Sequence, residues 1–226
     1  VFSQTENDTT LLGLPGDNLD LYAVLDLFQN SKTIEEFEKS LNEEKTGINN
    51  LDLNLDTKVD FIKVETKQKD ESFTFILQVD VTEKETQDVA VILVDRDKNK
   101  KVTLQIVGDE SSTAPATTTT VVVESTPMIV YIYSPVYVPY HPPYHFGFYP
   151  PYFVAFTCIA VSAYRHHHYV YHYPHAAYHG GRYEGHNTVV IHNTNNFNNY
   201  NVSRRTSNTV NHNMAKGGYN ANRAAA

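Results

Sequence analysis

Two stretches of the chain carry side chains whose types and spacing suit metal chemistry. The first, NLDLNLDTKVD at residues 50–60, places oxygen-bearing side chains at alternate positions. A calcium ion takes six to eight hard oxygen ligands, and alternate residues of a tight loop can point theirs inward. The expected ligands are the side chains of Asp52, Asn54, Asp56 and Asp60 and the main-chain carbonyl of Lys58.

This loop departs from the usual calcium pattern at two positions. Position 6, normally a glycine with a permissive backbone, is Thr57, and no glutamate follows at position 12. Two interpretations therefore stay open. Either the loop binds calcium, or it keeps only the turn, with its aspartates bonded to neighbouring amides. In both cases we expect a structural clip and not a reaction centre.

The second stretch is YRHHHYVYHYPHAAYH at residues 164–179. Imidazole suits zinc and copper, and histidine-rich tracts often bind them. On a strand, His166, His168 and His172 would share a face; on a helix, His168 would neighbour His172, and His175 would neighbour His179. The only nearby acid is Glu184. The tract is therefore interpreted as a transition-metal site, a haem site, or a pH-sensitive aromatic or adhesive surface.

The elements before residue 110 predict an α+β fold. Apolar residues recur at helical spacing over 21–28 and 34–41, and TIEE at 33–36 is a capping box, so a helical hairpin is expected. Strands are expected at 59–66, 73–81, 88–94 and 101–107, with the turn DRDKNK between the last two. Helices followed by strands favour an antiparallel sheet over a doubly wound one.

Composition divides the 226 residues into two unlike parts. Residues 1–112 carry 24 acidic and 12 basic residues, and the remainder carries 2 acidic and 6 basic ones. All 11 histidines and 15 of the 16 tyrosines lie beyond residue 130. The net charge of −8 argues against a general nucleic-acid binder. The single cysteine, Cys158, excludes an internal disulfide, and no apolar run is long enough for a membrane-spanning helix.

Five segments follow from these patterns: a flexible N-terminus at 1–13, the α+β domain at 14–110, a Ser/Thr/Pro linker at 111–120, a Tyr/His/Pro-rich segment at 121–186 and an Asn-rich segment at 187–226. The last two are expected to be irregular or β-rich. Prolines prevent a regular helix in 128–152, and the Asn-rich residues suit a strand at 187–194 with stacked amides. The aromatic content indicates that this half buries surface somewhere.

The stretches LPGDNLDLYAVLDLFQNSKTIEEFEKSLN and INNLDLNLDTKVDFIKV resemble an uncharacterised family of secreted or envelope proteins from Bacteroidota bacteria. In that family both Leu55 and Thr57 of the loop are usually glycine, and a Tyr/Pro-rich tail like HFGFYPP at 145–151 recurs. The resemblance covers about residues 14–110 and implies a small α+β fold and an exported location. It implies no activity. The first residues, VFSQ, fit the edge of a removed signal peptide.

The leading functional hypothesis is a non-enzymatic protein of the periplasm, the outer-membrane surface or the extracellular space. Its aromatic second half would assemble with copies of itself, in a fibre or matrix, or with an outer-membrane complex. The alternative is a transition-metal-binding protein that uses the histidine tract. An enzyme is the weakest hypothesis, because no nucleophile turn such as G-x-S-x-G occurs.

Overall fold

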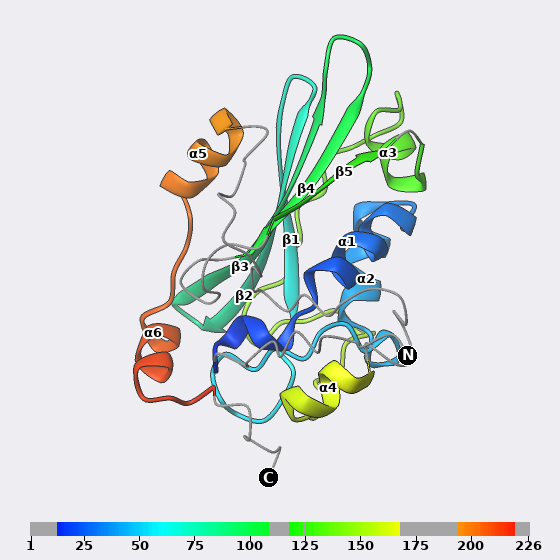
Figure 1. The fold of residues 1–226 in the computed structure, drawn as a ribbon. Helices are drawn as coiled ribbons and strands as arrows, with labels where there is room; N and C mark the ends of the chain where they lie inside the picture. Colours follow the sequence, from blue (N-terminus) through cyan, green and yellow to red (C-terminus); the bar gives the residue numbers. More distant parts are fainter. Residues whose placement is uncertain (1–12, 109–117, 124, 168–193, 220–226) are drawn as a thin grey trace, which may run out of the picture.

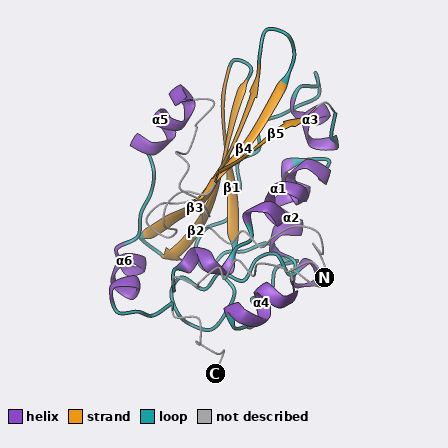
Figure 2. Cartoon of the chain, in the orientation of Figure 1, coloured by secondary structure: helices purple, strands orange, loops and turns teal. Residues whose placement is uncertain are grey.

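The computed structural model describes residues 13–108, 118–123, 125–167 and 194–219, and its elements form an α+β fold (Figures 1 and 2). The helical hairpin consists of α1 (Leu21–Asn30) and α2 (Ile34–Asn42). The sheet strands are β1 (Ile62–Lys69), β2 (Ser72–Thr82), β3 (Glu85–Arg96), β4 (Val102–Gly108) and β5 (Thr118–Val123). Four more helices follow: α3 (Pro127–Ile132), α4 (Val161–His167), α5 (Thr194–Val202) and α6 (Asn208–Ala215). The predicted fold class, a helical hairpin with an antiparallel sheet, is confirmed.

Local capping explains where the two hairpin helices begin. The Asp20 carboxylate accepts the amides of Tyr22 and Ala23 at the start of α1. At the start of α2, the Thr33 hydroxyl accepts the Glu36 amide, as the capping box predicts. The expected apolar faces of both helices are buried: Leu21, Val24, Leu25 and Phe28 on α1, and Ile34, Phe37 and Leu41 on α2.

The sheet is an antiparallel meander in the order β1-β2-β3-β4-β5. Its two faces are covered differently, because side chains alternate along each strand. Helices α1, α2 and α3 cover one face, where Phe73, Phe75 and Leu77 of β2 belong to the main core (Figure 1). On the other face, Tyr200 of α5 packs with Ile76 and with a short row on β3 and β4.

Several features of the second half differ from the sequence-based expectations. Strand β5 begins at Thr118 and pairs with β4, so the end of the predicted linker 111–120 belongs to the sheet. The described part of the Asn-rich segment forms α5 and α6, and α3 and α4 lie in the Tyr/His/Pro-rich segment, so the expectation that these two segments are irregular or β-rich is wrong over these helices. The exclusion of a regular helix from 128–152 is wrong over the residues of α3, which precede the prolines of that stretch. Residues 168–193, including most of the strand expected at 187–194, lie outside the described part of the chain.

No helix in the described residues combines the length and apolar character that crossing a membrane requires.

Candidate functional site on the tyrosine strap

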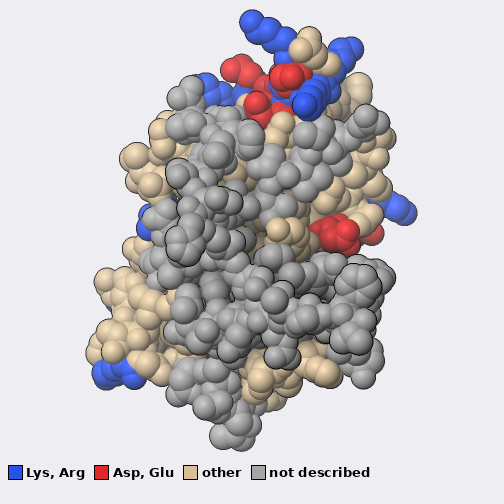
Figure 3. Space-filling model, viewed as in Figure 1, with Lys and Arg blue, Asp and Glu red and all other residues tan. Residues whose placement is uncertain are grey.

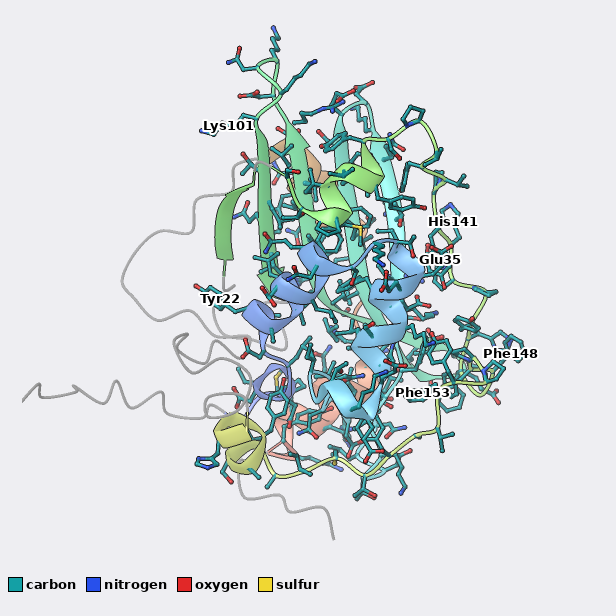
Figure 4. The ribbon with its side chains drawn as sticks, turned by 90° about the vertical axis from the view of Figure 1, so that its right-hand side faces the viewer. Tyr22, Glu35, Lys101, His141, Phe148 and Phe153 are labelled. Carbon is teal, nitrogen blue, oxygen red and sulfur yellow. The ribbon has the colours of Figure 1, made fainter. Side chains whose placement is uncertain are left out.

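A largely irregular stretch at residues 133–160, here called the strap, joins α3 to α4 and runs beside α2 and the β1 edge of the sheet (Figure 4). Its upper end is anchored by aromatic side chains. The Tyr133 hydroxyl donates to the Glu71 carbonyl at 2.8 Å, and its ring meets that of Phe73 edge to face at 5.2 Å. The Tyr137 ring meets the same phenylalanine at 5.3 Å. The tyrosines on this side therefore extend the core of the N-terminal domain.

The middle of the strap is fixed by a buried carboxylate, Glu38 of α2. Its Oε1 accepts the Tyr140 hydroxyl at 2.7 Å, and its Oε2 accepts the Val64 amide of β1 at 2.8 Å. One helical turn later, the Asn42 amide group bonds both the carbonyl and the amide of Ile62 at 2.8 Å. Glu38 and Asn42 thus satisfy outward-pointing backbone groups of β1, an edge strand whose exposed groups could otherwise recruit another chain.

The environment of Glu38 changes its acidity. The side chain is only 1% exposed, and burial raises its pKa to about 7 from an ordinary 4.5. The bonds from Tyr140 and Val64 oppose this rise, whereas the neighbouring charges of Glu65 and Glu35 add to it. The carboxylate that ties helix, strand and strap together therefore titrates near neutral pH.

The lower end of the strap packs around Phe61. The rings of Tyr144, Tyr149 and Phe153 lie 5.0 to 5.7 Å from it. The Asn50 side chain then holds the Ile159 backbone with two bonds, at 2.8 and 2.9 Å. The strap is therefore joined to the domain along its length by rings and by backbone bonds.

Tyr164 of α4 secures the end of this segment. Its hydroxyl donates to the Ile48 carbonyl at 2.6 Å and accepts the Asp20 amide at 2.9 Å, and the side chain is buried. The bond thus connects α4 to the residue that caps α1.

The outward side of the same segment has the opposite character. Five large apolar side chains of the strap, together with Val130 of α3, are between 47% and 79% exposed and are here called the outer row: Val130, Val136, Val138, Phe148, Val154 and Ile159. The inward and outward sides alternate over short distances, since Val136 and Val138 flank the half-buried Tyr137. Several exposed apolar side chains along one segment are a candidate interaction surface.

A groove lies between α2 and the strap and encloses about 460 Å³. It is lined by Glu35, Glu36 and Lys39 of the helix and by Tyr140, Tyr144 and Tyr152 of the strap, together with a proline. The Lys39 ammonium lies 5.5 Å from the centre of the Tyr152 ring. The groove therefore combines aromatic walls with carboxylates.

The predicted calcium loop lies beneath the end of the strap and forms a tight turn. The Asp52 carboxylate accepts hydrogen bonds from the backbone amides of Asp56 and Thr57, at 3.0 and 2.9 Å. The Asn54 side-chain oxygen also accepts the Asp56 amide. The Asp56 carboxylate in turn accepts the Lys58 amide. Asp60 accepts the Leu53 amide at 2.6 Å. Leu55 and Thr57 take the left-handed backbone that glycine would favour, with φ of 65° and 72°. These contacts show the turn that both interpretations share, and calcium binding stays a prediction.

The structure connects this loop to the strap in a way the sequence did not indicate. The Val59 amide donates to the Phe156 carbonyl at 2.8 Å, and the Cys158 amide donates to the Thr57 carbonyl at 3.1 Å. The Cys158 thiol lies 3.7 Å from an Asp52 oxygen. The loop is therefore part of the surface on which the strap ends.

Of the five histidines predicted as transition-metal ligands, the structure describes only His166, which is exposed on α4. His168, His172, His175 and His179 lie outside the described residues. Within the described ranges, no three His, Cys, Asp or Glu side chains are grouped so that they could hold a metal ion. Zinc or copper binding by the tract thus stays a prediction.

Sequence analysis missed Glu38, Asn42 and Tyr164 as organising residues. A signal existed for the first two, because they are polar residues four positions apart on the face of α2 that also carries Leu41. Nothing local identifies Tyr164, whose partners are more than a hundred residues away.

Comparison with known proteins found no matching family model, curated protein or solved structure. The strap, its outer row and its groove are therefore the features from which we infer a function.

Proposed function

We propose that this chain is a non-enzymatic, exported interaction protein that assembles with copies of itself through the outer face of its tyrosine strap. The observation that carries the proposal is the outer row, six exposed apolar side chains of which five lie on the strap and one, Val130, on α3; tyrosines hold the strap to the domain. An anchored apolar surface binds a partner at a lower entropic cost than a free tail, because it is already ordered.

The polar groups of the strap region support an interaction role and not a catalytic one. Glu38 and Asp52 accept backbone amides, and the Tyr164 hydroxyl bridges a carbonyl and an amide. These bonds fix the scaffold on which the outer row is displayed. Export to the periplasm, the outer-membrane surface or the extracellular space is part of the proposal and rests on the family resemblance of residues 14–110.

Sedimentation of the triple variant V136S/V138S/V154S against wild type tests the proposal. The three valines are 69% to 79% exposed, so serine removes apolar surface without opening the core. Each loses about 1 kcal/mol of burial in an assembly, and we expect self-association to weaken at least tenfold. Val202→Ser is the matched control, because Val202 is 91% exposed but lies on α5. Equal self-association of the triple variant and wild type would overturn the proposal.

A further inference from the structure

The groove between α2 and the strap carries more acidic than basic side chains. Glu35 and Glu36 line it, the buried Glu38 carboxylate feels the charge of Glu35, and the charge of Glu43 acts on Tyr152. Among the described residues that line it, the one cation is Lys39. Within the described chain, the Glu35 side chain makes no hydrogen bond or ion pair. The groove therefore offers a carboxylate and tyrosine faces to a cation from outside.

The strap already binds cations of its own chain on its tyrosine rings. The Lys39 ammonium lies 5.5 Å from the Tyr152 ring centre, and the Arg96 guanidinium lies 3.9 Å from that of Tyr133. A cation over a tyrosine face is attracted by the ring quadrupole, more strongly where water is excluded. Tyr140 and Tyr144 line the same groove. The chemistry that suits it is an ammonium group on an aliphatic stem, as in lysine.

Lysines of this description gather at the tip of the β3–β4 hairpin. Lys98, Lys100 and Lys101 are exposed, and their ammonium groups make no ion pair within the described residues. The nearest acid in the turn, Asp97, accepts the amides of Asn99 and Lys101. Figure 3 shows Lys and Arg side chains projecting at this end of the molecule, next to Asp and Glu side chains. The tip is therefore a narrow projection with surplus positive charge.

The tip and the groove lie at separate places on one molecule. Figure 4 shows Lys101 at the upper left, at the end of the β3–β4 hairpin, and Glu35 lower and to the right, on α2. β4 and β1 are separated by two strands in the sheet order. A contact between the two surfaces therefore joins two molecules.

We infer that the groove receives the lysine-bearing hairpin tip of a second copy of this chain. The inference rests on the proposed self-assembly and specifies one head-to-tail contact within it. Because the two surfaces differ, the contact is heterologous, and a pair of molecules keeps one free tip and one free groove. Repetition of such a contact gives an open chain of molecules unless the rotation closes a ring.

Charge reversal in full-length chains tests the contact. Glu35→Lys reverses the groove, and K98E/K101E reverses the tip; each variant alone should self-associate at least tenfold more weakly than wild type. Mixing the two variants should restore association, because each reversed surface then meets its complement. Lys84→Glu, an exposed lysine in the β2–β3 turn, is the control for charge alone and should leave association unchanged.

Lys39, which already lies over the Tyr152 ring, provides a variant that should strengthen self-association instead of weakening it. Lys39→Met removes the cation that occupies Tyr152, so association should tighten, whereas Lys84→Met should have no effect. Wild-type association should also weaken as salt rises from about 50 mM to about 500 mM, where the screening length falls below 5 Å.

Each result has a defined meaning. If wild type associates, V136S/V138S/V154S does not, and the charge variants match wild type, the tip contact is refuted while the proposed function stands. Loss of association in both charge variants without recovery on mixing also refutes the pairing of tip and groove. A wild-type chain that stays monomeric refutes both.

Discussion

The raised pKa of Glu38 leads us to predict an unusual pH dependence: the unfolding free energy of the protein should fall as the pH rises toward neutrality. The carboxyl group has a pKa of about 7 when folded and an ordinary value of 4.5 when unfolded. A raised folded pKa means that the native state binds the proton more tightly, so the contribution is fully present below pH 4.5 and is lost as pH rises through 7. Complete loss corresponds to about 3 kcal/mol at about 1.36 kcal/mol per pH unit.

The groups that face Glu38 determine the size of this effect. Tyr140 of the strap and Val64 of β1 donate to the carboxylate, while Glu35 of α2 and Glu65 of β1 repel it. Between pH 5 and pH 8 the linkage equation gives a loss of about 2.5 kcal/mol for this group. For a chain of this length that corresponds to about 5 to 10 °C in Tm.

The assay is thermal or urea unfolding of wild type, Glu38→Gln and the exposed-site control Glu83→Gln at pH 5, 6, 7 and 8. The quantity compared is the change in unfolding free energy with pH, because all other titrating groups cancel in the difference. Glu38→Gln should lack about 2.5 kcal/mol of the wild-type change, and Glu83→Gln should keep it. Parallel wild-type and Glu38→Gln curves would refute the reasoning.

Three further predictions concern the parts that hold the strap and its neighbours. Tyr164→Phe should lower the unfolding free energy by about 2 kcal/mol, because it removes two buried hydrogen bonds, to the Ile48 carbonyl and from the Asp20 amide; a loss below about 0.5 kcal/mol would contradict this. Lys100 has a left-handed backbone, with φ of 63°, in the β3–β4 turn, so Lys100→Gly should raise the unfolding free energy by about 1 kcal/mol. Lys98→Gly should not raise it, and chemical denaturation at high salt measures both variants. Asp52→Ala should cost about 2 kcal/mol even in EDTA, because Asp52 accepts two amides of its loop; a loss seen only with added calcium would show that the ion, and not the turn, holds the loop.

The helices and strands of the first half follow from local patterns. The apolar spacing around Phe28 and Phe37 and the capping Thr33 act within one or two helical turns, so the sequence alone predicts α1 and α2. The alternation of β-branched residues likewise predicts β1 to β4. The same reasoning could have identified β5, because TTTVVV is rich in β-branched residues. Its polar composition favoured the linker interpretation instead.

The Asn-rich segment shows long-range contacts overriding local propensity. Asparagine is a weak helix former, yet α6 begins where the Ser207 hydroxyl accepts the Val210 amide and the Ser207 amide donates to Gln87 of β3 at 2.8 Å. The cap is readable in the sequence, but its partner on the sheet is not. The expectation of an irregular or β-rich segment failed there because it considered side-chain stacking without the tertiary contacts.

The candidate site could be predicted only in its composition. The abundance of tyrosine and proline indicated a segment that buries surface, but not which rings point inward. That assignment depends on Glu38, Phe61 and Phe73, which lie 60 or more residues before their strap partners. Val136 and Val138 look like core residues in sequence and are exposed because their neighbours on the strap take the inward positions.

Sedimentation velocity of the full-length wild-type chain over a concentration series most directly tests whether the strap mediates self-assembly. The account predicts that the mass rises with concentration from the 25.6 kDa monomer to multiples of it, and that V136S/V138S/V154S removes this rise while Val202→Ser does not. A single 25.6 kDa species at every concentration, up to the millimolar range, would contradict it.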